Sequence, residues 1–327
     1  MTVRVGVVGV GVMGADHARK LATVIAGAEV VSVADVNTAV ARRVADELGA
    51  GVHQDGFAVI EDDGVDAVVI ATHDDTHAEL ILAALRVGKP VMCEKPLATT
   101  AAECRTVVEA QSALAAAVDP VTVGFMRRFD PSYVALRQRV LGGALGNPLI
   151  VHCVSRTVRT YPGGDSASSI TQSAIHELDI VPWLLDSPIV SVSYQHGRSS
   201  ANSERRQDPQ LYLLRTASDV LVTVELFLNA RYGYDTRCEV VMENGTAALT
   251  LPTHIVTDSE RQRSVGYPAD WIPRYSDAYR IELQEWIDSV RQSRVSTLAG
   301  AADGLRASVV ADALVQSMNA NGTWVTI

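Results

Sequence analysis

A lysine that could act on a bound ligand stands at position 95, directly after an apolar run and directly before Pro96. The run, residues 91–93, is typical of a buried strand, and open α/β sheets bind their ligands at the carboxyl ends of such strands. Pro96 lacks a backbone N–H and disfavours helical geometry in its predecessor, so it ends the strand and fixes the direction in which Lys95 leaves it. The pattern also fits an ordinary solvated lysine, and other parts of the chain must decide between the two.

A histidine that could transfer protons lies in the second half of the chain, at position 176. An unperturbed histidine has a pKa of about 6.5 and can therefore accept a proton near neutral pH. Gln172 and Asp179 lie one turn before and one turn after it, which places all three on one face of a helix predicted for residues 170–185. Polar residues on one face of an otherwise apolar helix indicate a hydrated cleft. A histidine that is hydrogen-bonded within the core is the alternative.

A glycine-rich turn near the start of the chain suits a phosphate group. Gly9, Gly11 and Gly14 form the pattern G-x-G-x-x-G between a predicted strand, residues 3–8, and a predicted helix, residues 12–22. In this pattern the first glycine permits a tight turn, the second lets the backbone approach a pyrophosphate, and the third allows helix to pack on strand. The N–H groups at the helix N-terminus would face the phosphates. This adds two candidate cofactor-binding residues, Val12 and Met13.

An aspartate follows the next predicted strand at the spacing that dinucleotide-binding folds use. Asp35 ends the run of residues 29–34 and lies 21 residues after Gly14, where an acid binds the ribose hydroxyls of the cofactor. Its charge would repel a 2′-phosphate, and no arginine follows it at Val36 or the next two positions, so NAD is favoured over NADP. Asp35 could instead cap the helix predicted for residues 38–48, and both roles can coexist.

Strands and helices alternate through the first part of the chain, which predicts a doubly wound parallel sheet over residues 1–123. The carboxyl ends of its strands would carry the cofactor, so Thr72, His73 and Glu94 are further candidates. His77 lies in the first turn of a predicted helix; we favour a cofactor neighbour over a residue on the helix surface, because that helix N-terminus faces the same crevice. The remaining predicted strands are residues 66–71, 90–93 and 121–124, and the remaining helices are residues 76–87 and 99–117.

The pattern changes after residue 125. A helix is predicted for residues 131–141, and strand-like runs follow that only the helix of residues 170–185 interrupts. Hairpin signals at Asn244 and Gly245, and at residues 217–219, join some of these runs. Residues 124–327 are therefore predicted to form an α+β domain with a large, mostly antiparallel, open-faced sheet. Its predicted strands are residues 148–156, 189–195, 210–215, 220–228, 238–242 and 246–251.

Composition limits the classes to which the chain can belong. It has 327 residues, of which 47% are hydrophobic and 20% charged, as in a soluble globular protein of about two domains. The formal net charge of -10, with basic residues spread along the chain, provides no footprint for nucleic acid or an anionic membrane. The four cysteines form no C-x-x-C pair, so we expect neither a disulfide framework nor a metal site. Without a signal peptide or a membrane-spanning apolar run, we expect a cytoplasmic protein.

Several short motifs, taken together, identify a family. They are the glycine pattern of residues 9–14 and the segments 35–37, 93–98, 123–130, 176–179 and 232–235. Along essentially its whole length, the chain resembles the glucose–fructose oxidoreductase/inositol dehydrogenase/MocA family. The glycine pattern and Glu-Lys-Pro mark the superfamily only, whereas Phe-Met-Arg-Arg-Phe-Asp and Tyr-Gly-Tyr-Asp are closer to the inositol-oxidising members.

The resemblance implies a fold and a reaction. It implies an N-terminal Rossmann domain and the NAD-linked oxidation of the axial hydroxyl of myo-inositol to the 2-keto product, in a homotetramer that pairs through the second-domain sheets. Lys95 matches the family's catalytic lysine and His176 its catalytic histidine. In such a reaction His176 would take the hydroxyl proton while the Lys95 ammonium stabilises the forming carbonyl oxygen. Beside these two, the residues expected to bind the polyol are Met126, Arg127, Thr157, Gln172, Asp179 and Tyr234.

One position departs from the family. The inositol dehydrogenases carry an aspartate four residues before the histidine, where this chain has Gln172, a third candidate catalytic residue. Glutamine can hold an imidazole or a hydroxyl by hydrogen bonds, but it cannot supply the negative charge that favours the imidazolium. Thr157 likewise stands where asparagine is usual. Three functions therefore remain open: a myo-inositol dehydrogenase, a dehydrogenase of another cyclitol or sugar, and an NAD-binding sensor without turnover.

Overall fold

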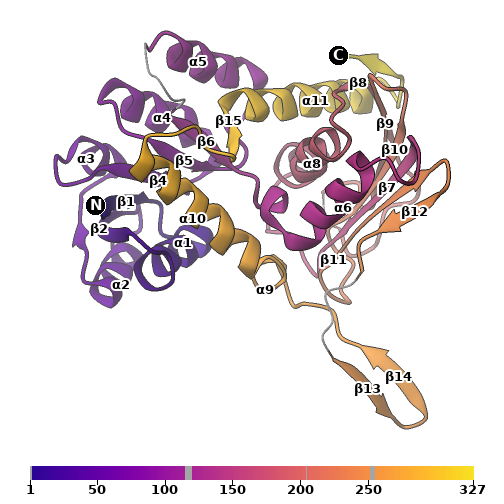
Figure 1. Cartoon of the computed structure of the whole chain (residues 1–327), viewed down its shortest axis with the longest axis horizontal. Helices are drawn as coiled ribbons and strands as arrows, with labels where there is room; N and C mark the ends of the chain where they lie inside the picture. The colour runs from indigo at the N-terminus through magenta and orange to yellow at the C-terminus, as the bar shows by residue number, and fades with distance from the viewer. Residues whose placement is uncertain (1, 115–119, 204, 251–254) are drawn as a thin grey trace. The chain divides into compact units, whose positions relative to one another are not determined.

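Two compact units make up the structure, a computed structural model that describes residues 2–114, 120–203, 205–250 and 255–327 (Figure 1). Unit 1 comprises Met1–Met126 and Asp277–Ser308, and unit 2 comprises Arg127–Ser276 and Val309–Ile327. Neither unit is one continuous segment, because the chain returns to unit 1 after completing most of unit 2. The predicted domain boundary between residues 123 and 124 stays a prediction.

Unit 1 is built on a seven-stranded sheet with the strand order β15-β6-β5-β4-β1-β2-β3. All pairs from β1 to β6 are parallel, and β15 pairs with β6 in the antiparallel sense. The strand order reverses at β1, which is the mark of the predicted doubly wound sheet. The strands are β1 (Val3–Val8), β2 (Ala28–Ala34), β3 (Gly51–Val52), β4 (Ala67–Ile70), β5 (Val91–Glu94), β6 (Val121–Gly124) and β15 (Ala299–Gly300).

The helices of unit 1 begin where side chains cap them. Asn37 caps α2, and a capping box between Thr100 and Glu103 starts α5 two residues later than predicted. A 3₁₀ turn, η1 (Asp74–Thr76), similarly precedes α4; the last residues predicted for the α5 segment, 115–117, lie outside the described residues. The helices are α1 (Val12–Thr23), α2 (Thr38–Leu48), α3 (Gly56–Glu61), α4 (His77–Arg86), α5 (Ala101–Ser112) and nearly all of α10 (Ser276–Gln292).

Unit 2 is built on a second seven-stranded sheet, in the order β12-β11-β7-β10-β9-β8-β16. Its strand pairs are antiparallel except for β7 and β10, so the prediction of a mostly antiparallel sheet is confirmed. A separate hairpin pairs β13 with β14. The strands are β7 (Pro148–Arg156), β8 (Ile189–Gln195), β9 (Gln210–Thr216), β10 (Leu221–Phe227), β11 (Asp235–Met242), β12 (Gly245–Ala248), β13 (Val256–Ser259), β14 (Gln262–Val265) and β16 (Val325–Thr326).

The two faces of the unit 2 sheet differ in burial. On β10, Val222, Val224 and Leu226 are buried, whereas the alternating residues Leu221, Thr223, Glu225 and Phe227 are only half-buried. The same alternation runs along β7, as expected when one face supports the core and the other stays uncovered. The helices assigned to unit 2 are α6 (Pro131–Leu141), α7 (Ser166–Ser168), α8 (Ile175–Leu185) and α9 (Trp271–Arg274), and α11 (Ala301–Asn319) runs from unit 1 into unit 2.

The helix predicted for residues 170–185 is not one regular α-helix. Residues Ser169–Ala174 form a π-helical segment, η3, and the α-helix α8 begins only at Ile175. Serine side chains compete with the backbone for hydrogen bonds at this start: the Ser168 and Ser169 hydroxyls donate to the Asp165 carbonyl at 2.8 and 3.1 Å. π-helical turns are frequent at functional sites, and this one carries Gln172.

Candidate functional site

The glycine turn between β1 and α1 has the geometry that a pyrophosphate needs. Gly9 has a φ of 82°, and a Cβ atom at Gly14 would lie 1.8 Å from the Gly9 carbonyl oxygen, so both positions require glycine. A Cβ atom at Gly11, in contrast, would meet nothing within 4 Å. No side chain caps α1, whose first turn includes the exposed Val12 and also Met13. The turn is thus closely packed at Gly9 and Gly14 and open at Gly11.

Asp35 lies at the end of β2 and holds this turn in place. Its Oδ2 accepts a hydrogen bond from the Val10 amide at 2.9 Å, and its Oδ1 accepts one from the Asn37 amide at 2.8 Å. The Asn37 side chain, rather than Asp35, accepts the hydrogen bonds that cap α2, so the alternative role considered for Asp35 is wrong. Val36 is fully exposed, which leaves this side of the loop accessible.

The candidates after β4 divide between surface and core. The Thr72 hydroxyl accepts a hydrogen bond from the Thr76 hydroxyl at 2.7 Å, and the His73 side chain is 84% exposed. His77 is 1% exposed, so the interpretation as a helix-surface residue is wrong. Its Nδ1 lies 2.7 Å from the Pro96 carbonyl oxygen and its Nε2 lies 3.3 Å from that of Thr72. His77 therefore ties the loop after β4 to the loop after β5.

Lys95 follows β5 directly and is half-buried. Its backbone N–H donates to Oε2 of Glu94 at 3.2 Å, and Oε1 of Glu94 lies 2.7 Å from Nε2 of His17. Burial raises the pKa of Glu94, but the hydrogen bond from His17 and the charge of Lys95 outweigh it, so this pKa lies below its usual value. Glu94 is therefore a buried carboxylate next to Lys95.

His17 is a site residue that the sequence analysis missed. It is fully buried on α1, and its ring meets the Tyr279 ring of α10 edge-on with 5.6 Å between the ring centroids. Figure 1 shows α1 and α10 side by side in unit 1. The available signal was its place three residues after Gly14, on the face of α1 that the glycine pattern packs against the sheet.

In unit 2, two consecutive arginines bind two acids of α8. The Arg127 guanidinium, 2% exposed, forms an ion pair with Glu177 and lies 3.5 Å from the Ser155 hydroxyl. Arg128 binds the buried Asp179 through two hydrogen bonds, one of them from Nε to Oδ2 at 3.0 Å. Both arginines belong to η2 (Met126–Phe129), whose Met126 is also buried. The first turns of α8 are therefore fastened to η2.

His176 lies in the first turn of α8 and is half-buried. The residue after it is Glu177, and Asp179 follows within the same turn, so the two ion pairs hold the backbone on which His176 stands. Paired arginine and carboxylate groups have fixed geometry, which restricts how this turn can rotate. The two ion pairs therefore hold the first turn of α8, and with it the backbone of His176, in one position.

Gln172 is exposed on η3, and the loop before it is clasped by one arginine. Arg206 donates to the Thr160 hydroxyl at 3.1 Å and to the Ser169 hydroxyl at 3.3 Å, and it also binds the Gly163 carbonyl. The Gln207 amide adds a hydrogen bond to the Ser166 hydroxyl at 2.8 Å. Residues 160–169, which lead into η3, are thus held from the segment before β9.

The remaining candidates of unit 2 lie at the ends of β7 and β11. The Thr157 hydroxyl donates to the Leu228 carbonyl at 2.7 Å. Tyr234 is 6% exposed, its ring meets the Tyr275 ring edge-on at 6.1 Å, and burial raises its pKa.

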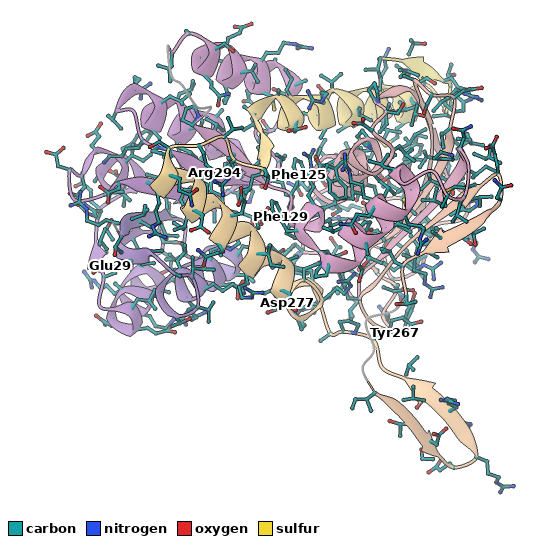
Figure 2. The ribbon with its side chains drawn as sticks, viewed as in Figure 1. Glu29, Phe125, Phe129, Tyr267, Asp277 and Arg294 are labelled. Carbon is teal, nitrogen blue, oxygen red and sulfur yellow. The ribbon has the colours of Figure 1, made fainter. Side chains whose placement is uncertain are left out.

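Asp235, beside Tyr234, is the centre of a charged cluster. Arg237 binds its carboxylate at 2.9 and 2.7 Å, and the Tyr232 hydroxyl also donates to it. The Tyr232 ring stacks edge-on against Tyr267, which follows β14 (Figure 2). The Asp235 carboxylate is therefore bound by side chains of the protein itself.

The candidate residues form two groups, one in each unit. Unit 1 gathers the glycine turn, Asp35, His77, Glu94 and Lys95, and unit 2 gathers Arg127, Arg128, Asp179, His176 and the loop before Gln172. The unit 1 group fits a dinucleotide, because the turn is open at Gly11, the α1 N-terminus has no side-chain cap, and a carboxylate stands at the end of β2.

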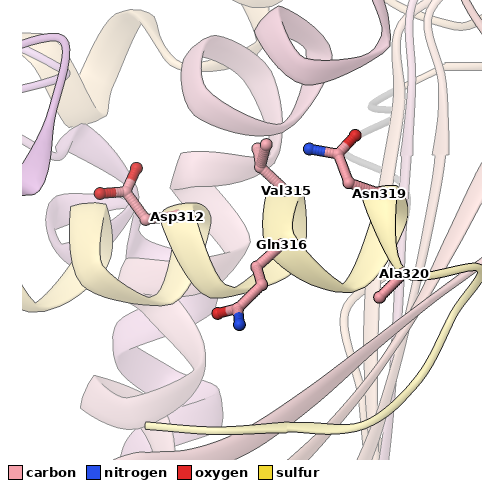
Figure 3. Close-up of a pocket in the computed structure, with 5 residues that line it drawn as sticks. All are labelled: Asp312, Val315, Gln316, Asn319 and Ala320. Atoms are coloured by element: carbon pink, nitrogen blue, oxygen red, sulfur yellow. The ribbon is translucent and has the colours of Figure 1, made fainter.

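Other features of the described residues take no part in this arrangement. A hollow of about 490 Å³ on α11 is lined by none of the candidates (Figure 3). Within the described ranges, no group of three or more histidine, cysteine, aspartate and glutamate side chains could hold a metal ion. No helix in the described part of the chain is long and apolar enough to cross a membrane. The lining residues of the hollow are Asp312, Val315, Gln316, Asn319 and Ala320.

Two family models match the chain, one for each half. Residues 3–121 match the model of an oxidoreductase family with an NAD-binding Rossmann fold, and residues 137–327 match the C-terminal α/β domain of the same family. The chain belongs to the Gfo/Idh/MocA oxidoreductase family. The predictions of family, fold class, NAD as the cofactor and an NAD-dependent oxidoreductase are therefore confirmed.

Members of the Gfo/Idh/MocA family that are similar to this chain include inositol dehydrogenases. Inositol 2-dehydrogenase 2 of Paenarthrobacter aurescens is 50% identical over 99% of this chain and 98% of its own length. Inositol 2-dehydrogenase 1 of Saccharopolyspora erythraea is 45% identical over 100% of this chain and 97% of its own. The crystal structure of myo-inositol dehydrogenase from Lactobacillus casei, in complex with NAD(H) and myo-inositol, is 32% identical and superposes with a TM-score of 0.95, covering 100% of this chain and 97% of the other.

Proposed function

We propose that this oxidoreductase oxidises a ring hydroxyl of a cyclitol to a ketone, with myo-inositol as its substrate and 2-keto-myo-inositol as its product. Full-length similarity to the Lactobacillus casei enzyme, whose structure contains NAD(H) and myo-inositol, carries the proposal. Similarity to inositol 2-dehydrogenases over 99% and 100% of the chain supports it. The exposed Gln172 and the half-buried His176 provide the polar groups that a polyol needs.

The residues of unit 1 would bind the cofactor and stabilise the product oxygen. Gly9, Gly11 and Gly14 would hold the pyrophosphate, and Asp35 the ribose hydroxyls. NAD, when bound, supplies the acceptor for the hydride that leaves the carbinol carbon. The Lys95 ammonium would donate to the oxygen that becomes a carbonyl, which stabilises its negative charge as the hydroxyl proton leaves.

The residues of unit 2 would orient the polyol and take its proton. His176 is the proposed general base, because an imidazole can accept the hydroxyl proton near neutral pH. Asp179 and Arg128 form a fixed pair whose outer lone pairs and N–H groups could bind ring hydroxyls. Tyr234 and Thr157 would complete the wall around the substrate. Met126 and Arg127 are buried, so we propose that they shape and support this wall.

Gln172 would replace a charge by a hydrogen bond. As an amide it can accept from the imidazole of His176 or donate to a substrate hydroxyl, but it cannot favour the imidazolium electrostatically. Proton uptake by His176 would therefore be less favourable than beside an aspartate. The glutamine at position 172 therefore also supports a second candidate function, that of an NAD-binding protein that has lost turnover.

A panel of polyols tests the proposal. NADH formation is followed with myo-inositol, its stereoisomers and several aldoses, and NADH binding is measured separately by fluorescence. We expect turnover with myo-inositol at a higher kcat/KM than with the other compounds. Turnover with another ring only would replace the substrate, and NADH binding without turnover on any compound would favour the sensor.

We further propose a cytoplasmic homotetramer whose copies pair through the uncovered face of the unit 2 sheet. Half-buried apolar residues, among them Leu213, Leu221 and Phe227, stand on this face of neighbouring strands, together with polar residues such as Thr223 and Glu225. Association through this face would remove the apolar side chains from water. Light scattering should yield four times the mass of one chain, and Leu213→Glu should lower it because a charge would be buried. A monomer at assay concentration would refute this assembly.

A further inference from the structure

Two buried histidines hold the backbone on either side of Lys95. Before the lysine, its own N–H donates to the Glu94 carboxylate at 3.2 Å, and that carboxylate lies 2.7 Å from Nε2 of His17. After the lysine, the Pro96 carbonyl oxygen lies 2.7 Å from Nδ1 of His77. His17 and His77 are 0% and 1% exposed and come from α1 and from the start of α4. The backbone on both sides of the half-buried Lys95 is thus anchored in the core of unit 1.

We propose that His17 and His77 are positioning residues for the reaction, which hold the backbone around Lys95 and thereby aim its ammonium group. We call His17, Glu94 and His77 the histidine bracket. The inference rests on the proposed function, in which Lys95 acts on the reacting oxygen. It adds His17 to that function, and for His77 it replaces the contact with the cofactor expected from the sequence by a role that acts through Lys95.

The direction of each hydrogen bond in the bracket is fixed by its acceptor. An ionised carboxylate and a backbone carbonyl can only accept, so Nε2 of His17 and Nδ1 of His77 must be the donors. The second nitrogen of His17 has no hydrogen-bond partner among the described residues. Within the bracket His17 uses Nε2 and His77 uses Nδ1, whereas Nε2 of His77 lies 3.3 Å from the Thr72 carbonyl oxygen outside it, and the difference within the bracket can be tested.

A role in packing alone does not explain the bracket. Apolar residues of similar volume usually fill a core at least as well as a buried ionic pair, so stability does not require Glu94 to be a carboxylate here. Gly124, the residue of β6 next to Glu94, would accommodate a Cβ atom 3.5 Å from the carboxylate, which is ordinary contact, so the geometry is not forced by crowding. The bracket instead lies at the carboxyl end of β5, where such sheets act on ligands.

The experiment replaces each histidine in turn by leucine, by glutamine and by asparagine. The amide nitrogen of glutamine can reach the place of Nε2, and that of asparagine the place of Nδ1. His17→Gln and His77→Asn therefore keep the hydrogen bond, whereas the exchanged amides, His17→Asn and His77→Gln, are matched controls that misplace it. His53→Leu is a further control, because it removes a half-exposed histidine that lies 3.0 Å from Asp62 and is not part of the bracket.

We expect His17→Leu and His77→Leu to lower kcat about 10²-fold, the cost of a misplacement of about 1 Å. The KM for the polyol and the Kd for NADH should change by less than about twofold, the error within which independent effects add. His17→Gln and His77→Asn should recover most of kcat, and the exchanged amides should not. His53→Leu should match the unmodified enzyme.

A double-mutant cycle with Lys95→Met separates positioning from general damage. If the histidines act through the lysine, their replacement should have no further effect on the residual turnover of Lys95→Met. Equal losses in both backgrounds, or equal kcat for matched and exchanged amides, would overturn the bracket. Wild-type turnover in Lys95→Met itself would instead overturn the proposed role of the lysine. If a leucine variant does not fold, the comparison of the amides still decides.

Discussion

The discrimination between NAD and NADP can be worked out from the surroundings of Asp35. We consider Asp35→Asn, alone and together with Val36→Arg. In the unmodified protein the two Asp35 oxygens accept hydrogen bonds from the backbone amides of Val10 and Asn37. Asp35→Asn removes the negative charge and leaves only one side-chain oxygen to accept them. Val36→Arg adds a cation at a fully exposed position, where an arginine can reach a 2′-phosphate without disturbing the core.

The size of the effect follows from Coulomb's law and from the burial of Asp35. Two unit charges 4 Å apart repel each other by about 1 kcal/mol in water and by about 4 kcal/mol at an effective dielectric constant near 20. Asp35 is half-buried, so a phosphate next to it should cost an intermediate amount. We therefore expect a preference for NAD of at least about tenfold, which corresponds to about 1.4 kcal/mol.

The assay is kcat/KM for each cofactor at saturating polyol. Asp35→Asn should weaken the glycine turn and lower kcat/KM with both cofactors, but the ratio cancels this common loss and reports the charge. The ratio should fall toward one in Asp35→Asn and fall further when Val36→Arg is added. Equal efficiencies in the unmodified enzyme, or an unchanged ratio in Asp35→Asn, would refute the reasoning.

Further outcomes follow from other residues. Lys95→Met should leave NADH binding near normal and lower turnover roughly 10²–10⁴-fold, and unchanged turnover would contradict its role. Gln172→Asp should move the acid limb of the kcat/KM profile to higher pH; an unmoved limb with a raised KM would indicate direct substrate contact. Arg206→Lys should raise the KM for the polyol several-fold without changing NADH affinity, because one ammonium cannot replace the guanidinium fork, and an unchanged KM would show that the clasp is dispensable. Burial raises the pKa of Asp235, but hydrogen bonds from Arg237 outweigh it, so its pKa is low and its carboxylate stabilises the fold above about pH 4. The difference in unfolding free energy between the unmodified enzyme and Asp235→Asn should shrink as pH falls through that low pKa, and a constant difference would contradict this assignment.

Elements whose limits are set by neighbouring residues could be predicted from the sequence. The helix predicted for residues 38–48 is α2, because Asn37 caps it and Gly49 ends it in a left-handed conformation. The strand predicted for residues 148–156 is β7. The hairpin signal at Asn244 and Gly245 joins β11 to β12 as predicted. These signals lie within a few residues of what they determine.

Features that depend on distant residues could not be predicted in this way. Glu94 and His17 are 77 positions apart, and Arg128 and Asp179 are 51 apart, so no local pattern relates either pair. The π-helical segment before α8 has no signal in the apolar pattern, which predicts one regular helix over residues 170–185. No element was predicted beyond residue 251, where α10 and α11 lie, although Trp286 of α10 is buried.

The return of the chain to unit 1 limits how its parts can be exchanged between relatives. Tyr279 meets His17, the Gln284 side chain accepts from the Ala26 amide at 2.8 Å, and β15 completes the sheet beside β6. A chimaera that took only residues 1–126 from a relative would place foreign residues against the host's α10 and β15. Exchanging the whole of unit 1 between relatives therefore requires three crossover points, after residues 126, 276 and 308, so that residues 277–308 travel with the α1 helix and the β6 strand that they contact.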